Sequence, residues 1–453
     1  MLTLGLALVD WVEAFCVHGP GDVEGQPVLL DDEFAAFIAR CYEIDESGKR
    51  RVRRAVISRP KGRAKSELAA FLAVAEAIGP VRFSHFAAAG EVSPWGYRYA
   101  EGEPVGKPVQ RPEVLCFATE LGQAGNTYEA IHYMLNPETA SPFLVETYGR
   151  MDVGLTRIIL PSGGVITPES AADSSKDGAK STFAVFDETH LWTLPRLKRM
   201  HQVVLRNLLK RKIASGWCLE TTTMYAPGEG SVAEKSHEYA KAVVEGQVSD
   251  AGLLFDHREA PAKYDPKFKS HRVAGLTEVY GPASSWMDLD AISDSYDDPQ
   301  TSAAEWQRYW FNRPVSLQGA WLSQAAWDEC QVARVIPDGA EVVLALDGSF
   351  SGDSTALVAV EMGEFPQSPA RMTPATKRFT DYVNTRALTH AGDAALTRHV
   401  SNAVLKRDSR GTRLTKESKS SERRIDLAVA AVMAVERAVT RVEDPAPPSV
   451  NFY

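Results

Sequence analysis

The sequence lacks several features that would place it at once in a familiar class. Its formal net charge is −9, so no overall basic excess attracts nucleic acid, and any DNA contact must come from local patches. Its five cysteines are odd in number and include no C-x-x-C pair, which argues against a disulfide framework or a zinc site and fits a reducing cytoplasm. No apolar run reaches the roughly 18 residues of a membrane span. We therefore expect no membrane partner.

A signal peptide and an internal repeat are also lacking. The apolar start, "MLTLGLALVDWVEAFCVHG", has no basic region before it and is interrupted by Asp10 and Glu13. We interpret it as an amphipathic helix. The chain is long, however. Its 453 residues, of which 44% are hydrophobic, are enough for two or three domains with hydrophobic cores.

Strand and helix patterns alternate as far as about residue 245. Apolar strands are predicted at "RAVISR", "EVLCFAT", "TRIIL", "TFAVFDE" and "WCLETTT". Helices are predicted over residues 26–44, 65–78, 122–135, 194–214 and 231–245. This alternation predicts an α/β fold, with a parallel sheet covered by helices on both faces.

The rest of the chain has a different organisation. Residues 246–340 are irregular and rich in Asp, Trp and Pro, so we expect a lid or linker between a first domain, 1–245, and a second, 341–442. The second domain opens with a predicted hairpin at 341–361 and closes with a helix at 423–439. The Pro-rich tail, 443–453, is predicted to be flexible.

The segment "AVISRPKGRAKSELAAFLAVAEAIG" resembles a phosphate-binding loop, whose usual pattern is G-x-x-x-x-G-K-[ST]. Lys65 and Ser66 match it, but Arg59 and Ala64 occupy the two glycine positions. The substitutions narrow the backbone conformations available, yet the lysine, the hydroxyl and the helix N-terminus remain. Lys61 would add charge near the phosphates. On this segment alone, a basic helix N-terminus without a ligand remains an equal alternative.

A second motif favours the nucleotide-binding interpretation. In "STFAVFDETHLW" four apolar residues lead directly into Asp187 and Glu188. A buried strand that ends in two acids is typical of ATPases, where the first acid holds Mg²⁺ and the second polarises the attacking water. Solvated acids at a strand end are the alternative, but the combination with the lysine-serine turn is much less common.

Two further segments are suggestive but not specific. A predicted strand ends in Thr221, Thr222 and Thr223, whose hydroxyls would sense the γ-phosphate region, although threonine favours strands in any case. Residues 194–213 carry seven basic residues and no acid, which indicates either a DNA-backbone contact or a solvated helix face.

The C-terminal part contains a second candidate centre. Asp347 ends the first strand of the predicted hairpin, and Asp426 lies near the start of the closing helix. Ribonuclease H-like folds bring such acids together to hold Mg²⁺ or Mn²⁺ for phosphodiester cleavage. Asp353 is a weaker candidate, since a turn residue explains it equally well. Between these acids, residues 403–418 form a predicted basic hairpin that would follow a phosphate backbone or simply be solvated, and its basic residues are Lys406, Arg407, Arg410, Arg413 and Lys416.

Taken together, these motifs resemble the large terminase subunit of tailed bacteriophages, the motor that packages viral DNA and cuts it. The resemblance covers nearly the whole chain and rests on the order of "RPKGRAKSE", "TFAVFDETHLW", "TTTMYAPGEGS", "LALDGSFSGDSTA" and "RRIDLAVAAVMA". In that family a basic residue commonly replaces the first glycine of the phosphate loop, so the variant loop is expected to be functional. Ala64 is a further departure.

The resemblance implies a role for each matching residue. ATP would be bound by Arg59, Lys61, Gly62, Lys65, Ser66 and Asp187, with Mg²⁺ held by Ser66 and Asp187. Glu188 would be the catalytic carboxylate, and Thr221–Thr223 would couple hydrolysis to movement. Asp347 and Asp426 would be catalytic metal ligands of the nuclease, and Arg407, Arg410 and Arg413 would contact DNA.

The resemblance also implies partners and a setting. These are double-stranded DNA, a portal protein, a small terminase subunit and a homo-oligomeric ring on the procapsid, in the host cytoplasm. A neighbouring subunit would supply an arginine finger, for which Arg157 is a candidate.

One departure concerns the second domain. Family members continue after the first hairpin through further strands and helices, whereas here "LVAVEMGEFPQSPARMTPATKRF" passes almost at once into the segment that usually follows. Either the chain has an internal deletion near residues 360–367 or this sequence omits a segment, and we favour the omission. A helicase-like ATPase without nuclease activity is the alternative function, and it would have no need of Asp347 and Asp426.

Overall fold

The computed structural model describes residues 1–118, 121–169, 180–250, 252–315, 321–322, 324–332, 343–347, 356–360, 368–408, 411–416 and 424–442. The chain divides into two compact units, one of Met1–Tyr225 with Gly230–Pro314, the other of Ala226–Glu229 with Val315–Tyr453. The division near residue 315 falls within the expected lid or linker, most of which belongs to the first unit. Within the described ranges no helix is long and apolar enough to cross a membrane.

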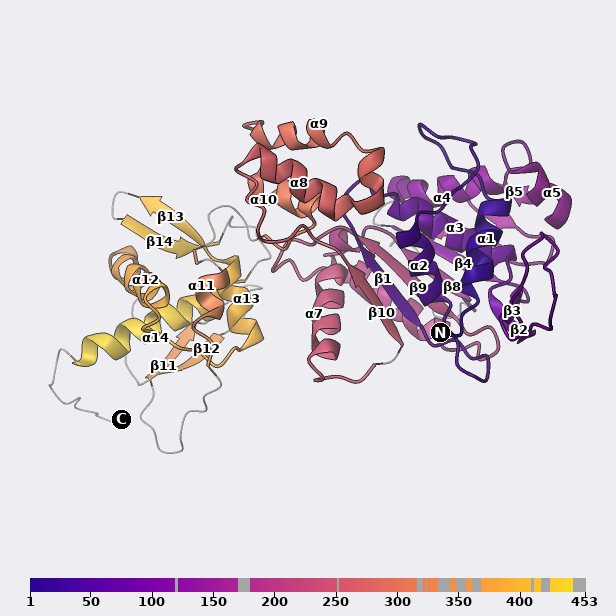
Figure 1. Cartoon of the computed structure of the whole chain (residues 1–453). Helices are drawn as coiled ribbons and strands as arrows, with labels where there is room; N and C mark the ends of the chain where they lie inside the picture. Colours follow the sequence, from indigo (N-terminus) through magenta and orange to yellow (C-terminus); the bar gives the residue numbers. More distant parts are fainter. Residues whose placement is uncertain are drawn as a thin grey trace. The chain divides into compact units, whose positions relative to one another are not determined.

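An eight-stranded sheet organises the first unit (Figure 1), with strand order β10-β1-β9-β8-β4-β7-β6-β5. Six neighbouring strands run parallel, which confirms the predicted fold class: β10 (Leu253–His257), β1 (Arg54–Ser58), β9 (Trp217–Thr222), β8 (Phe183–Phe186), β4 (Glu113–Phe117) and β7 (Val165–Glu169). The short strands β6 (Ile158–Ile159) and β5 (Asp152–Val153) add an antiparallel edge. A separate antiparallel pair joins β2 (Arg82–Phe86) to β3 (Pro104–Lys107).

Both faces of the sheet are covered, as the alternation along β8 demonstrates. Phe183 and Val185 join the larger core with helices α1 to α4, whereas Ala184 and Phe186 join a second core with α6. Successive strand residues point to opposite faces, so a strand buried on both sides is apolar throughout. The helices are α1 (Gly5–Phe15), α2 (Asp32–Cys41), α3 (Lys65–Ile78), α4 (Leu121–Leu135), α5 (Pro142–Tyr148), α6 (Pro195–Leu208) and α7 (Val232–Val244).

The remainder of the first unit is a helical segment with a core of its own. It follows β10 and contains α8 (Lys269–Tyr280), α9 (Leu289–Asp294), α10 (Ala303–Trp306) and a π-helical turn, Gln307–Phe311. Trp306, Phe311 and Tyr280 are fully buried in its core. We did not predict β10, which extends the sheet at the side of β1.

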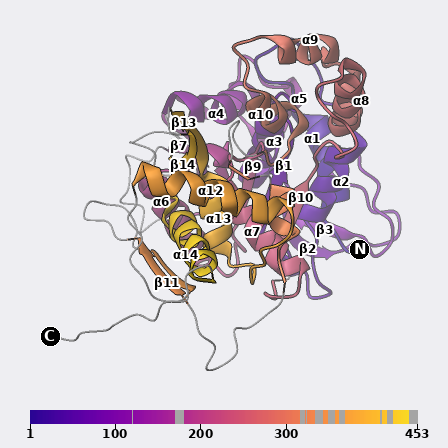
Figure 2. The ribbon, with the colours of Figure 1, turned by 90° about the vertical axis from the view of Figure 1, so that its left-hand side faces the viewer.

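The second unit begins its described sheet with the predicted hairpin, β11 (Val343–Asp347) paired antiparallel with β12 (Ala356–Val360). The closing helix, α14 (Asp426–Val442), packs on both strands. Figure 2 shows it beside α12 (Pro369–Asn384) and α13 (Ala394–Asn402). Also in this unit are α11 (Gln324–Asp328), β13 (Val404–Asp408) and β14 (Gly411–Thr415). The tail 443–453 and the suspected gap at 361–367 lie outside the described residues.

Candidate nucleotide and nuclease sites

The loop between β1 and α3 has the backbone that a phosphate loop requires, although glycine is largely absent. Ala64, at the second glycine position, is left-handed, with φ 55° and ψ 28°, and Gly62 has φ 83°. A left-handed alanine costs about 1–2 kcal/mol, so the fold imposes this conformation on a residue that disfavours it. Arg59, at the first glycine position, does not have a positive φ. An arginine is therefore accommodated there without backbone strain.

We expect Ala64→Gly to keep or raise stability. Glycine removes the left-handed penalty of about 1–2 kcal/mol but adds roughly 0.4–1 kcal/mol of unfolded-state entropy, so the free energy of unfolding should rise by about 0–1.6 kcal/mol. Urea unfolding of the variant and wild type measures this difference. Ala242→Gly, inside α7, is the matched control and should lose about 1 kcal/mol. A comparable loss in Ala64→Gly would contradict the left-handed assignment.

Lys65 begins α3 with its ammonium group buried, as only 5% of the residue is exposed. Its Nζ donates to the Pro60 carbonyl oxygen at 2.9 Å and to Thr223 Oγ1 at 3.3 Å. Burial lowers the pKa of Lys65, while the charges of Glu188 and Asp187 act in the opposite direction. The ammonium group thus lies between the loop backbone, the end of β9 and two acids. A bound phosphate would replace its two neutral partners, the Pro60 carbonyl and the Thr223 hydroxyl.

Asp187 follows β8 and is 3% exposed. Its carboxylate accepts hydrogen bonds from Thr221, from Thr127 at 2.8 Å and from Ser66. Burial, followed by the adjacent charge of Glu188, raises the pKa of Asp187 despite these bonds. A buried carboxylate bonded to the hydroxyl of Ser66 fits the oxygen donor set of Mg²⁺, whose charge would offset the desolvation of Asp187.

Glu188 is the more accessible acid, with 33% of its side chain exposed. Its Oε2 lies 3.0 Å from Nδ1 of His190. Burial alone would raise the pKa of Glu188, but the hydrogen bond from His190 and the charge of Lys65 outweigh it and lower the pKa to about 2. The carboxylate is therefore ionised at neutral pH and suited to accept a hydrogen bond from an attacking water.

His190→Ala should slow ATP hydrolysis about tenfold, since a hydrogen bond to a charged group is worth roughly 1.5–3 kcal/mol. The reason is positional, because without His190 the carboxylate of Glu188 is free to rotate. Steady-state kinetics should show the loss in kcat with little change in KM. His190→Asn, which retains a donor, should recover part of the rate, and the exposed His85→Ala is the control. An unchanged kcat in His190→Ala would show that His190 does not position the carboxylate of Glu188.

Asp187, Glu188 and His190 face one cavity of about 220 Å³, and the residues that line it are Lys61, Ala118, Asp187, Glu188, His190, Leu191, Thr223 and Tyr309. The Tyr309 carbonyl accepts from the Lys61 backbone N–H at 2.8 Å, and its ring lies 5.7 Å from the Lys61 ammonium. The Tyr280 hydroxyl donates to the Lys61 carbonyl at 2.5 Å. The helical segment after β10 therefore binds both the backbone N–H and the backbone carbonyl of one loop residue, Lys61, which the sequence pattern did not reveal.

The structure places the Arg59 side chain differently from our expectation. Its guanidinium donates to Glu33 and, at 2.6 Å, to Asp256, and the side chain is 3% exposed. Arg63 and Arg258 also bind Glu33, at 3.3 and 2.8 Å. Arg59 thus links the loop to α2 and β10 instead of lining the cavity. Its phosphate contact stays a prediction that would require this network to open.

The three threonines reach three different catalytic groups. Thr221 donates to Asp187, Thr222 Oγ1 accepts from the His190 backbone N–H at 3.1 Å, and Thr223 Oγ1 accepts from Lys65. The end of β9 and the residue that follows it therefore contact Asp187, His190 and Lys65, and the coupling role of these threonines stays a prediction.

Directly after these threonines, the chain is tied to the helical segment. The Met224 backbone N–H donates to Asn312 Oδ1 at 2.7 Å. The Asn312 amide donates to Ser58 Oγ at 3.1 Å and to the Arg258 carbonyl at 2.8 Å. One fully buried asparagine thus joins the ends of β1, β9 and β10, a role that no local motif reveals.

Arg157 lies far from this cavity along the sheet. It is exposed in the turn between β5 and β6, at the edge opposite β10. Strands β7 and β4 separate the β5–β6 turn from β8, whose end carries Asp187 and Glu188. Its role as an arginine finger for a neighbouring subunit stays a prediction.

In the second unit, Asp347 ends β11 and Asp426 begins α14, which packs on β11. Asp426 is 6% exposed, and the N–H of the next residue, Leu427, donates to His399 Nδ1 at 2.9 Å. Among the described residues no group of three or more His, Cys, Asp or Glu side chains could hold a metal. Asp353 lies outside those residues.

The predicted basic hairpin is confirmed as β13 and β14, with Asp408 paired to Gly411 across the turn. Lys406 pairs directly with Arg413, and Arg407 pairs with Thr412. Like charges directly opposite each other destabilise a strand pair, so a phosphate at Lys406 and Arg413 would relieve repulsion. Arg410 lies outside the described residues.

Comparison with known proteins identifies the second unit. Residues 359–441 match the family of the terminase large subunit, endonuclease domain. The matched range includes Asp426 and the basic hairpin, and it begins after Asp347.

Two similar phage proteins extend the likeness over most of the chain. The chain is 27% identical to the Gene 13 protein of Mycobacterium phage L5 over 412 residues, which cover 80% of this chain and 66% of that protein. The Gene 13 protein of Mycobacterium phage D29 is 27% identical over 413 residues, with the same coverage. The chain thus spans just under two thirds of the length of the curated relatives it matches.

The fold agrees with this assignment. The crystal structure of the HK97 bacteriophage large terminase superposes with a TM-score of 0.56 at 17% identity, covering 96% of this chain and 100% of that one. Residues 359–441 thus match the endonuclease domain of the terminase large subunit, two phage proteins are similar over most of the chain, and the fold is shared with a large terminase.

Proposed function

We propose that the first unit hydrolyses ATP to move double-stranded DNA into a viral procapsid, and that the second cuts concatemeric DNA with divalent metal ions. The observation that carries the ATPase proposal is the cavity lined by Asp187, Glu188 and Thr223, where Lys65 donates a hydrogen bond to Thr223. The nuclease proposal is supported by the family match over 359–441 and by the packing of α14, which begins at Asp426, on β11, which ends at Asp347.

Each residue has a distinct task in the proposed hydrolysis. Lys65 binds the β- and γ-phosphates, and Ser66 and Asp187 would hold Mg²⁺, which neutralises charge that develops on the phosphate oxygens. Glu188, ionised and held by His190, accepts a hydrogen bond from the attacking water and aligns it. Hydrolysis removes the anion opposite Lys65, whose bond to Thr223 then passes the change to β9.

The proposed path of coupling leaves the cavity through Asn312. Thr223 is followed by Met224, whose N–H is held by Asn312, and the same amide holds the ends of β1 and β10. A shift of β9 would therefore be transmitted to the helical segment, because an unsatisfied buried amide is costly.

The partners of this activity are proposals as well. DNA would be drawn in by a ring of these subunits on a portal protein, with a small terminase subunit that selects the DNA, in the host cytoplasm. The ring would bring Arg157 of one subunit towards the cavity of the next. The proposed contacts of the nuclease with the DNA backbone are Lys406, Arg407, Arg410 and Arg413.

The test is to measure both activities on the purified chain. ATP hydrolysis should depend on Mg²⁺ and rise with linear double-stranded DNA, and plasmid cleavage should depend on Mg²⁺ or Mn²⁺ and stop with a chelator. ATPase activity without cleavage in either metal would favour the helicase-like alternative. The absence of both would refute the proposal.

A further inference from the structure

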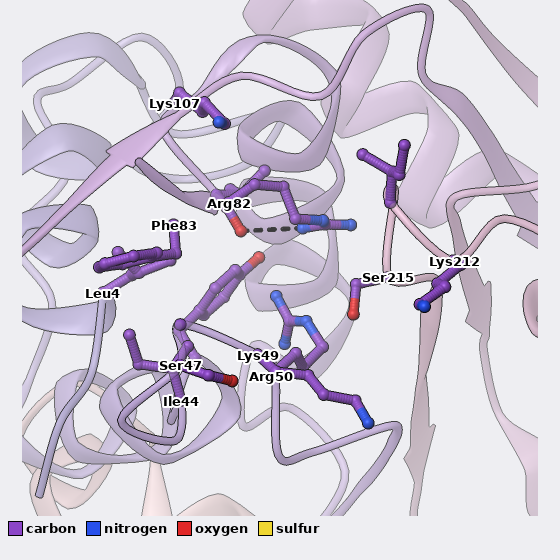
Figure 3. A pocket seen from close by; sticks show the side chains of 14 residues that line it. Leu4, Ile44, Ser47, Lys49, Arg50, Arg82, Phe83, Lys107, Lys212 and Ser215 are labelled. Atoms are coloured by element: carbon purple, nitrogen blue, oxygen red, sulfur yellow. Dashed lines mark hydrogen bonds between the residues drawn. The ribbon is translucent and has the colours of Figure 1, made fainter. Parts of the chain in front are cut away.

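A second cavity, of about 250 Å³, lies at the other end of the strands (Figure 3). Its walls come from the turn that precedes β1, from the residues that lead into β2, from the end of β3 and from the loop before β9. The nucleotide cavity is formed after β1, β8 and β9, where these parallel strands end. The two cavities therefore lie at opposite ends of the parallel strands. Neither the phosphate loop nor the pair of acids after β8 accounts for the second cavity.

The charge of this second cavity is one-sided. Its lining contains no acid but five cations, which are Lys49, Arg50, Arg82, Lys107 and Lys212. Figure 3 shows the two guanidinium groups near the centre, with Lys107 on one side and Lys49 and Lys212 on the other. Such a cluster is not what the chain's formal net charge of −9 would lead one to expect.

Beneath the cavity, two buried arginines share one carboxylate. Glu76, fully buried, accepts from Arg82 Nη1 at 2.9 Å and Nη2 at 2.8 Å, and lies 3.5 Å from Arg50 Nη2. It also accepts from the Tyr42 hydroxyl at 2.9 Å and the Trp217 indole at 2.8 Å. The single negative charge of Glu76 therefore offsets only one of the two positive charges of Arg50 and Arg82. The excess charge faces the cavity.

Arg50 is held rigidly in place. Its guanidinium carbon lies 4.6 Å from the ring centres of both Tyr42 and Trp217, and its side chain is 4% exposed. Burial, followed by the charge of Arg82, lowers the pKa of Arg50 to about 10, so the group remains charged at neutral pH. An uncompensated buried charge is costly, and an anion in the cavity would reduce that cost.

The rim supplies mobile donors. Lys107 and Lys212 are exposed, and in the part of the chain that the structure describes no ion pair joins either of them to an acid. Ser215, also in the lining, has φ 47°, a strained conformation for a serine that positions it at the cavity. Lys212 is the last basic residue of the segment 194–213, so the end of that segment lines this cavity.

We propose that this cavity binds a phosphate group, supplied either by a DNA backbone or as free phosphate. The guanidinium groups of Arg50 and Arg82 form the floor of the cavity, and three lysine ammonium groups from separate segments lie around it. Positive charge on several sides suits a compact tetrahedral oxyanion. An acidic peptide would need a longer groove to accommodate its backbone. The site is independent of the ATP-binding proposal, since it shares no residue with the nucleotide cavity.

Hydrogen–deuterium exchange of the full chain tests the proposal locally. Peptides that cover 42–50 and 211–217 should become protected on titration with inorganic phosphate, or with a 30-base-pair duplex, at constant ionic strength. In a Lys107→Gln, Lys212→Gln double variant the midpoint should weaken about tenfold or more. The double control, Lys235→Gln with Lys241→Gln on α7, should match wild type. Exchange of residues 59–68 reports separately on the nucleotide cavity.

Protection by phosphate alone would identify a site for a free oxyanion, and protection only by the duplex would identify a backbone phosphate; both results support the proposal. Failure of both probes to protect these peptides would overturn it. So would an unchanged midpoint in the Lys107→Gln, Lys212→Gln variant. Protection by a poly-glutamate peptide, with none by phosphate or DNA, would assign the cavity to an acidic partner instead.

Discussion

Glu188→Gln should reduce ATP hydrolysis about 10³-fold while ATP still binds, since general-base contributions are typically 10²–10⁴-fold. Glutamine keeps the size of the side chain but removes the charge that orients the attacking water. The low pKa of Glu188, about 2, means that the carboxylate is lost only as the pH falls through that value. Glu188 should therefore contribute no acid limb to the rate between pH 5 and 8.

The measurement pairs single-turnover hydrolysis with equilibrium binding of ATP. Lys65→Ala is the informative comparison, because it should lose binding as well as turnover when the phosphates lose their charged partner. Glu101→Gln, at an exposed position, is the matched control and should behave as wild type. Hydrolysis by Glu188→Gln at the wild-type rate would show that the strand-end acids had been assigned the wrong roles.

The second large effect concerns cleavage. Asp426→Asn should lower DNA cleavage by at least about 10³-fold, because two metal ions held a few ångströms apart need anionic oxygen ligands. ATP hydrolysis should remain within about twofold of wild type, since Asp426 lies in the other compact unit. Asp347→Asn should behave in the same way. Supercoiled plasmid in Mg²⁺ or Mn²⁺, scored by gel, gives the cleavage rate, and a coupled assay gives the ATPase rate.

Loss of folding must be separated from loss of chemistry in this experiment. Asp426 is the first residue of α14, where a negative charge stabilises the helix by about 0.3–1 kcal/mol, so a small drop in stability is expected. Asp393→Asn is the matched control in the same unit. Asp393 caps α13 through the Leu396 N–H, and asparagine caps equally well. Cleavage by Asp426→Asn at the control rate would exclude Asp426 as a metal ligand.

The local parts of the fold could be predicted closely. The helix expected at 65–78 is α3, residue for residue, because an apolar strand, a basic turn and an alanine-rich run each carry a strong local signal. Strand β8 and the hairpin β11–β12 lie within the predicted segments, although each strand is shorter than predicted. Buried parallel strands are apolar throughout, so their existence can be inferred from sequence even though their order cannot.

The parts of the site that escaped prediction come from distant segments. Tyr309 and Asn312 reach the cavity and the strand ends from about 250 residues beyond Lys61 and Ser58, and no local pattern records such a pairing. Arg59 was read as a phosphate ligand because charge is visible in the sequence, whereas its partners Glu33 and Asp256 become neighbours only after folding. His190 was visible in the motif, but nothing local revealed its hydrogen bond to Glu188.

The position of β1 in the sheet has a consequence for synthesis on the ribosome. Its two neighbours are β9 and β10, so after β1 emerges the ribosome must add roughly 160 further residues before the first of them exists, which takes roughly 8–30 s at 5–20 residues per second. During that interval an apolar strand, "RAVIS", has neither of its edges paired. The nascent first unit therefore passes through a long aggregation-prone stage, and we expect its yield to depend on chaperones that shield this strand.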